Sequence, residues 1–188
     1  MTLLRPDVVV IGASAGALDA LGTILPALPS DFAAPIIVVV HVPPDKPSVL
    51  AELFAAKCTL GVREAEDKEP LTSGVVYFAP PDYHLLVESD RTLSLSTEAP
   101  VLFSRPSIDV LFESASDAFG PGVVALVLTG ANEDGARGLK AVADAGGKTI
   151  VQQPETAFAS AMPEAALAAC PDAVVMELGE MAAYLRRF

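Results

Sequence analysis

The sequence predicts an α/β fold with three layers, in which helices cover both faces of a doubly wound, mostly parallel, Rossmann-like sheet. Two observations support this. Segments with helical spacing of their apolar residues separate short apolar runs. These runs are rich in Val and Ile without polar alternation, as expected for strands buried on both faces, and they lie at 8–11, 36–40, 123–128 and 149–151. Since 188 residues are typical of one domain, we expect residues 1–188 to form a single domain.

The predicted helices follow from apolar spacing and from residues that begin or end helices. The first ends at Pro29, a third has Ser104 or Ser107 as its candidate cap, and Gly146-Gly147 ends the fourth. The predicted helical ranges are 18–28, 48–57, from 106 onward, 136–145 and 163–169.

A different pattern occupies residues 75–96. Short β-like segments are separated there by Pro-Pro-Asp and Glu-Ser-Asp-Arg. This pattern predicts an antiparallel hairpin region at about 75–96, at one edge of the sheet.

Composition excludes several classes of protein. The formal net charge of −12, from 24 acidic and 12 basic residues, argues against nucleic-acid binding, which needs Lys and Arg to neutralise phosphates. The two cysteines, Cys58 and Cys170, lie outside any C-x-x-C spacing, so we expect no metal and a reducing, cytoplasmic location. No apolar run approaches the ~18 residues of a membrane span, and we expect no membrane insertion.

The loop after the first predicted strand reads Gly12-x-Ser14-x-Gly16. Its glycines would let the backbone approach a cofactor phosphate at a helix N-terminus. The same small residues would instead suit a tight strand-to-helix turn that exposes Ser14 as a nucleophile. The pattern alone leaves both interpretations open.

The loop after the second predicted strand favours the nucleophile. A dinucleotide site usually has Asp or Glu about 20 residues after the glycines, whereas this chain has His41 at the end of the second strand. Neutral imidazole is the usual base that activates a serine. Strands one and two, if adjacent, would bring Ser14 and His41 together. A buried histidine satisfied by backbone groups is the competing interpretation.

The loop after the strand at 123–128 supplies a carboxylate. A serine–histidine pair needs one to fix the imidazole tautomer, and both Glu133 and Asp134 are available. Asp134 would equally suit the N-cap of the helix at 136–145. The residues alone do not decide between these roles.

Five motifs in order resemble the catalytic domain of the chemotaxis protein-glutamate methylesterases, the CheB family: IGASAGA, HVPP, REAEDKEPLTSGVVYFAPPDYH, RPSIDVLFES and LTGANEDGARGL. The resemblance implies a triad of Ser14, His41 and Asp134, and it favours Asp134 over Glu133. It implies hydrolysis of γ-glutamyl methyl esters on the cytoplasmic helices of chemoreceptors, with deamidation of receptor glutamines in many members, and no cofactor.

An oxyanion site and substrate contacts complete the expected site. Backbone N–H groups would hold the oxyanion, and the candidates are those of Ala15 and Ala131. Acidic receptor helices would be repelled by a surface of this net charge, so we expect Arg105, Arg137 or both to contact substrate. A solvated arginine or a helix ion pair is the alternative for each.

The chain departs from the family pattern in two ways. Ala15 and Ala17 stand where the family usually has Thr and Gly, which removes a hydroxyl beside the nucleophile. The usual members also carry an N-terminal receiver domain, which we do not expect in this chain, so a separate regulatory protein, a stand-alone esterase or a fragment are the alternatives. A catalytically silent interaction domain and a nucleotide-binding module are the competing functions. His84 matches a motif, and we expect it to be structural or to line the site.

Overall fold

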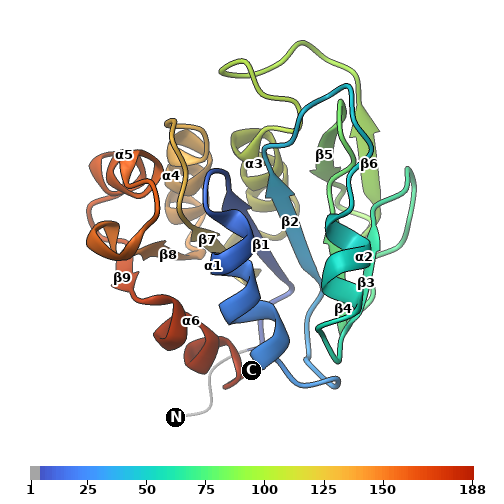
Figure 1. The fold of residues 1–188 in the computed structure, drawn as a ribbon, viewed down its shortest axis with the longest axis horizontal. Helices are drawn as coiled ribbons and strands as arrows, with labels where there is room; N and C mark the ends of the chain where they lie inside the picture. The colour runs from blue at the N-terminus through green and yellow to red at the C-terminus, as the bar shows by residue number, and fades with distance from the viewer. Residues whose placement is uncertain (1–4) are drawn as a thin grey trace.

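The computed structural model describes residues 5–188 (Figure 1). The first four residues of the predicted domain 1–188 lie outside this part. Within it, seven strands form one sheet in the order β3-β4-β2-β1-β7-β8-β9, and each neighbouring pair is parallel. The strands are β1 (Val8–Ala13), β2 (Ile36–Val40), β3 (Gly61–Glu64), β4 (Val75–Phe78), β7 (Val123–Val127), β8 (Lys148–Gln152) and β9 (Val174–Met176). The predicted parallel sheet is confirmed.

Helices cover both faces of this sheet. One buried apolar layer joins the sheet to α1, α2 and α6, and the other joins it to α3, α4 and α5. The helices are α1 (Ala17–Ile24), α2 (Leu50–Ala55), α3 (Ile108–Phe119), α4 (Ala136–Asp144), α5 (Ala161–Ala169) and α6 (Leu178–Leu185), with 3₁₀ turns η1 (Leu25–Ala27), η2 (Gly120–Gly122) and η3 (Pro154–Thr156). The predicted three-layer arrangement is therefore confirmed.

The hairpin predicted at about 75–96 is smaller than expected. β5 (His84–Val87) and β6 (Leu93–Ser96) pair in an antiparallel two-stranded sheet. β4, by contrast, lies between β2 and β3 in the parallel sheet, with Ile36 opposite Val76. Val76, Tyr77 and Phe78 are buried, because an apolar run without alternation suits a strand covered on both faces.

The strand order places the ends of β1, β2 and β7 side by side at the centre of the sheet. β1 pairs with β2 on one side and with β7 on the other, and the chain continues outward from β2 in one direction and from β7 in the other. Ligands of open α/β sheets bind at such a reversal, beyond the carboxyl ends of the strands. The loops after these three strands are therefore the place to look for a site.

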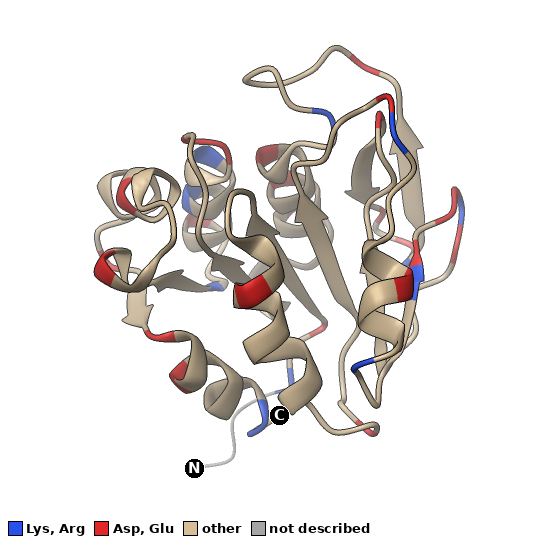
Figure 2. Cartoon of the chain, viewed as in Figure 1, with Lys and Arg blue, Asp and Glu red and all other residues tan. Residues whose placement is uncertain are grey.

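Charge is distributed broadly over this fold. Acidic positions are spread over helices and loops around the whole molecule (Figure 2). Within residues 5–188, no helix has both the length and the apolar composition needed to cross a membrane.

Candidate active site

Ser14 lies immediately after β1, and hydrogen bonds to both neighbouring strand ends fix its position. Its backbone N–H donates to the Thr129 carbonyl, 2.9 Å away, just after β7. On the other side, the His41 N–H donates to the Ala13 carbonyl at 3.2 Å. The side chains of Ser14 and His41 thus leave adjacent strand ends, as the sequence predicted.

The two glycines of this turn are required for different structural reasons. Gly16 has a φ of 84° and forms the N-cap of α1, and a Cβ there would lie 2.5 Å from the Cβ of Phe158. Gly12 faces Ile108 at the start of α3, where a Cβ would overlap the isoleucine side chain. The left-handed conformation of the turn falls on Gly16, whereas Ser14 keeps a φ outside that region.

His41 pairs with Asp134 rather than with the backbone. The His41 Nε2 lies 2.7 Å from Oδ2 of Asp134, and the histidine side chain is 12% exposed. The competing interpretation, a histidine satisfied only by backbone groups, is wrong. Because Nε2 faces the carboxylate, Nδ1 is the ring nitrogen left to act as a base. In the familiar serine protease arrangement the two nitrogens have the opposite roles.

The Asp134 carboxylate is completely buried and accepts four hydrogen bonds. Oδ2 accepts from His41 and from the Ile108 N–H at 2.7 Å. Oδ1 accepts from the Ser107 hydroxyl at 2.8 Å and from the Asp109 N–H at 3.0 Å. Burial alone would raise the pKa of Asp134, but the hydrogen bonds from His41 and the two backbone N–H groups outweigh it and hold that pKa below its usual value.

Asp134 does not cap the helix that follows it, so that alternative is wrong. Gly135 is the N-cap of α4, and Asp134 instead receives the first N–H groups of α3. Asp109 returns the contact, because its Oδ1 accepts from the N–H groups of Gly135 at 3.0 Å and Gly138 at 2.7 Å. Each aspartate therefore caps the other's helix. Burial raises the pKa of Asp109, although the Gly138 N–H opposes this shift.

A buried histidine, His84, contacts Ser107, one of the residues that donate hydrogen bonds to Asp134. Ser107 is the N-cap residue of α3, but its side chain makes no capping bond and turns to Asp134 instead. The Ser107 N–H donates to Nδ1 of His84 at 3.2 Å, and His84 Nε2 donates to the Ala99 carbonyl at 3.0 Å. His84 is only 2% exposed. It is therefore a structural residue that acts on the site through Ser107.

The N–H groups of Ala15 and Ala131 are both available for an oxyanion. Within residues 5–188, neither donates a hydrogen bond to a protein group. Ala15 directly follows Ser14, and Ala131 belongs to the loop between β7 and α4. The pair lies where β1 and β7 end, which is consistent with the predicted oxyanion site.

The two predicted substrate arginines lie in different surroundings. Arg105 lines a cleft of about 260 Å³ together with His41. Its guanidinium donates to Asp82 and to the carbonyls of Thr97 and Glu98, which occupies four of its five N–H bonds.

Arg137 lies on α4 and forms an ion pair with Glu113 of α3. Its side chain is 63% exposed, and its Nε is 4.0 Å from Asp109 Oδ2. It lines a separate cleft, which includes Leu102 and Glu133. The structure therefore brings Arg105, and not Arg137, into the cleft that contains His41.

Ser107 and Asp109 were not predicted as site residues. The sequence shows Ser107-Ile108-Asp109 only as a helix start, and the spacing of a hydroxyl and a carboxylate two residues apart at that start is the signal that was available. Within residues 5–188, no group of three or more His, Cys, Asp or Glu side chains could hold a metal ion.

An open parallel α/β sheet, with serine, histidine and aspartate side chains at its central strand ends, is the arrangement expected of a hydrolase that uses a serine nucleophile. Comparison with protein families narrows this class. The model of the CheB methylesterase family matches residues 9–185, and the chain belongs to this family. The family resemblance found in the sequence motifs is confirmed.

Individual relatives agree with this assignment. The crystal structure of the Thermotoga maritima CheB methylesterase catalytic domain is 32% identical and superposes with a TM-score of 0.92, covering 97% of this chain and 98% of that one. A Leptospira interrogans relative is 45% identical over 94% of this chain and 91% of its own length. The protein-glutamate methylesterase/protein-glutamine glutaminase of Archaeoglobus fulgidus is 41% identical over 85% of this chain, which spans only 46% of that protein.

Proposed function

We propose that this chain hydrolyses glutamate γ-methyl esters on methylated chemoreceptors, releasing methanol and restoring glutamate, and that it also deamidates receptor glutamines. The observation that carries the proposal is the pairing of His41, at the strand end next to Ser14, with the buried Asp134 carboxylate, 2.7 Å from the imidazole. Relatives named protein-glutamate methylesterase/protein-glutamine glutaminase support the substrate class. The reaction would take place in the cytoplasm, where we expect the receptor helices to lie.

The first half-reaction would transfer the acyl group to Ser14. Its Oγ attacks the ester carbonyl carbon while His41 Nδ1 takes the hydroxyl proton. Asp134 holds the Nε2–H tautomer and stabilises the imidazolium. As the tetrahedral intermediate collapses, His41 returns the proton to the leaving methoxide, and methanol departs. His41 then activates a water molecule, which releases the glutamate from Ser14.

The negative charge on the carbonyl oxygen requires hydrogen-bond donors. The backbone N–H groups of Ala15 and Ala131 are our candidates, and one such donor is typically worth ~3 kcal/mol in the transition state. Because backbone groups supply both bonds, the presence of alanine instead of threonine at position 15 leaves this function in place. Arg105 remains our candidate for a contact with an acidic substrate segment, and a separate regulatory protein remains a prediction.

Methanol release from methylated receptor membranes tests the proposal directly. We expect Ser14→Ala to abolish release, and Ser89→Ala, which changes an exposed serine in the β5–β6 turn, to retain the wild-type rate. Wild-type protein that releases no methanol would favour a silent interaction domain. Tight nucleotide binding without ester hydrolysis would favour the nucleotide-binding module.

A further inference from the structure

Two exposed phenylalanines stand on either side of the reactive residues. Phe103 is fully exposed and lines the cleft that contains His41. Phe158 is 83% exposed and lies against Gly16, two residues after Ser14. Since His41, Ser14 and the Thr129 loop follow β2, β1 and β7 in that spatial order, Phe103 lies on the His41 side of the site and Phe158 lies beside the Ser14 turn.

The backbone presents Phe103 at the tip of a strained turn. Val101 and Ser104 exchange hydrogen bonds of 3.0 and 2.8 Å across a two-residue loop. Both loop residues are left-handed, with φ values of 47° at Leu102 and 63° at Phe103. Such a turn normally favours Asn and Gly, and large apolar residues are unfavourable there. Residues in such sparsely populated backbone conformations cluster at active sites and ligand-binding segments.

The loop that carries Phe158 is anchored to the site. The Ala159 N–H donates to Thr129 Oγ1 at 2.9 Å, and the Ala159 carbonyl accepts from the Gly130 N–H at 3.0 Å. Thr129 Oγ1 also donates to the Ala15 carbonyl at 2.8 Å. The backbone next to Phe158 is therefore held beside the Ser14 turn by the same loop that leads to Asp134.

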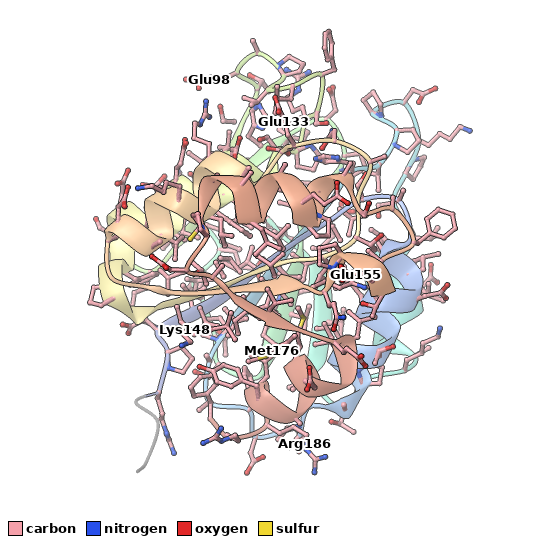
Figure 3. The ribbon with its side chains drawn as sticks, turned by 90° about the vertical axis from the view of Figure 1, so that its left-hand side faces the viewer. Glu98, Glu133, Lys148, Glu155, Met176 and Arg186 are labelled. Carbon is pink, nitrogen blue, oxygen red and sulfur yellow. The ribbon has the colours of Figure 1, made fainter. Side chains whose placement is uncertain are left out.

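Two exposed glutamates lie near the end of the molecule that carries the site. Glu98 and Glu133 lie at the same end of the molecule, opposite the end that carries Arg186 (Figure 3), and both glutamates are exposed. Together with the net charge of −12, they repel an acidic partner. A partner rich in glutamate therefore needs apolar contacts in addition to any contact that it makes with Arg105, which lines the same cleft as His41.

We propose that Phe103 and Phe158 are specificity-determining residues that contact the substrate helix on either side of the target side chain. The inference rests on the proposed function. A glutamyl methyl ester is neutral and would enter between the rings to reach Ser14. Apolar residues one turn before and after it on the same helix face would contact Phe103 and Phe158, in the manner of helix-in-groove recognition.

The test compares a protein substrate with a small one. We would measure kcat/KM for methanol release from a methylated receptor and from the γ-methyl ester of N-acetylglutamate, for wild type, Phe103→Ser and Phe158→Ser. Each substitution should lower the ratio of receptor to small-ester kcat/KM about tenfold, the effect of losing one interface anchor. Val175→Ser, a control at an exposed position on the distant edge strand β9, should leave the ratio unchanged.

The outcomes separate the inference from the proposed function. Active wild-type protein whose Phe variants keep the wild-type ratio overturns the inference alone. Wild-type protein that hydrolyses neither receptor ester nor small ester overturns the proposed function and the inference with it. If the Phe variants convert a dimer to a monomer in sedimentation without changing the ratio, the rings bind a second copy of this chain and the inference is wrong.

Discussion

Replacing Ser107 with alanine should remove one hydrogen bond to the Asp134 carboxylate and leave the carboxylate itself in place. The Ser107 hydroxyl is fully buried and donates one of the four hydrogen bonds that Asp134 accepts. A hydrogen bond to a charged group contributes ~1.5–3 kcal/mol, so we expect Ser107→Ala to lower the free energy of unfolding by about that amount. It should also raise the pKa of Asp134, because a donor to the charged form is lost.

The expected effect on catalysis is smaller than the loss of the carboxylate itself. Losing an orienting carboxylate costs about 10⁴-fold in kcat in serine proteases. In Ser107→Ala, Asp134 still accepts from His41, Ile108 and Asp109, so we expect a loss of about tenfold in kcat, on the order of the free energy of one such bond.

Urea unfolding followed by circular dichroism, together with methanol release, measures both quantities. Ser107→Cys is the matched control for size, because its thiol fills the same space but donates weakly, and it should lose nearly as much as Ser107→Ala. In an Asp134→Ala background, Ser107→Ala should have little further effect on kcat. A Ser107→Ala protein with wild-type stability and rate would refute this account of the site.

Three further predictions concern charge. Because the pKa of Asp134 is lower in the folded chain, its ionised form contributes stability above its unfolded pKa of about 3.9, and this contribution is lost as pH falls through the lower folded value. The difference in unfolding free energy between wild type and Asp134→Asn should thus be larger at neutral pH than in strong acid, and an equal difference would contradict this. Asp109→Asn keeps an oxygen that can cap α4 and should destabilise less in thermal unfolding than Asp109→Ala, for which a lost cap costs ~0.5–2 kcal/mol; equal losses would argue against capping. Raising the salt concentration from about 0.01 to about 0.15 M should lower KM for an acidic methylated receptor through screening, whereas a KM that rises would indicate net attraction.

The buried strands of the fold could be predicted because each has a local sequence signal. β1, β2, β7 and β8 are apolar runs of β-branched residues, and each occurs close to its predicted place. β3 was not predicted, because this edge strand reads Gly-Val-Arg-Glu and is largely exposed. β9 and α6 were also missed. The α6 start does carry a local signal, since Glu177 and Glu180 form a capping box.

The candidate site likewise contains residues that could be predicted from the sequence and residues that could not. The rule that parallel strands end at one edge of the sheet predicted that Ser14 and His41 leave adjacent strand ends, as β1 and β2 do. The choice of Asp134 over Glu133 came from the family resemblance, because the residues alone left both open. The contacts of Ser107 and Asp109 depend on how closely α3 and α4 pack, and no local pattern specifies that distance. The same holds for Phe103 and Phe158, whose significance comes from which loops lie beside the strand ends.

The reciprocal helix capping by Asp109 and Asp134 limits how the site can be engineered into another protein. Each carboxylate satisfies N–H groups at the start of the opposite helix, so neither helix can be replaced, shifted or lengthened at its start without leaving the other with unpaired donors. The Asp134 carboxylate is in this way fixed by an interface between two helices, rather than by its own loop. Grafting the residues 129–135 loop onto another sheet would therefore transfer the aspartate without its orientation, and the transferable unit is the helix pair.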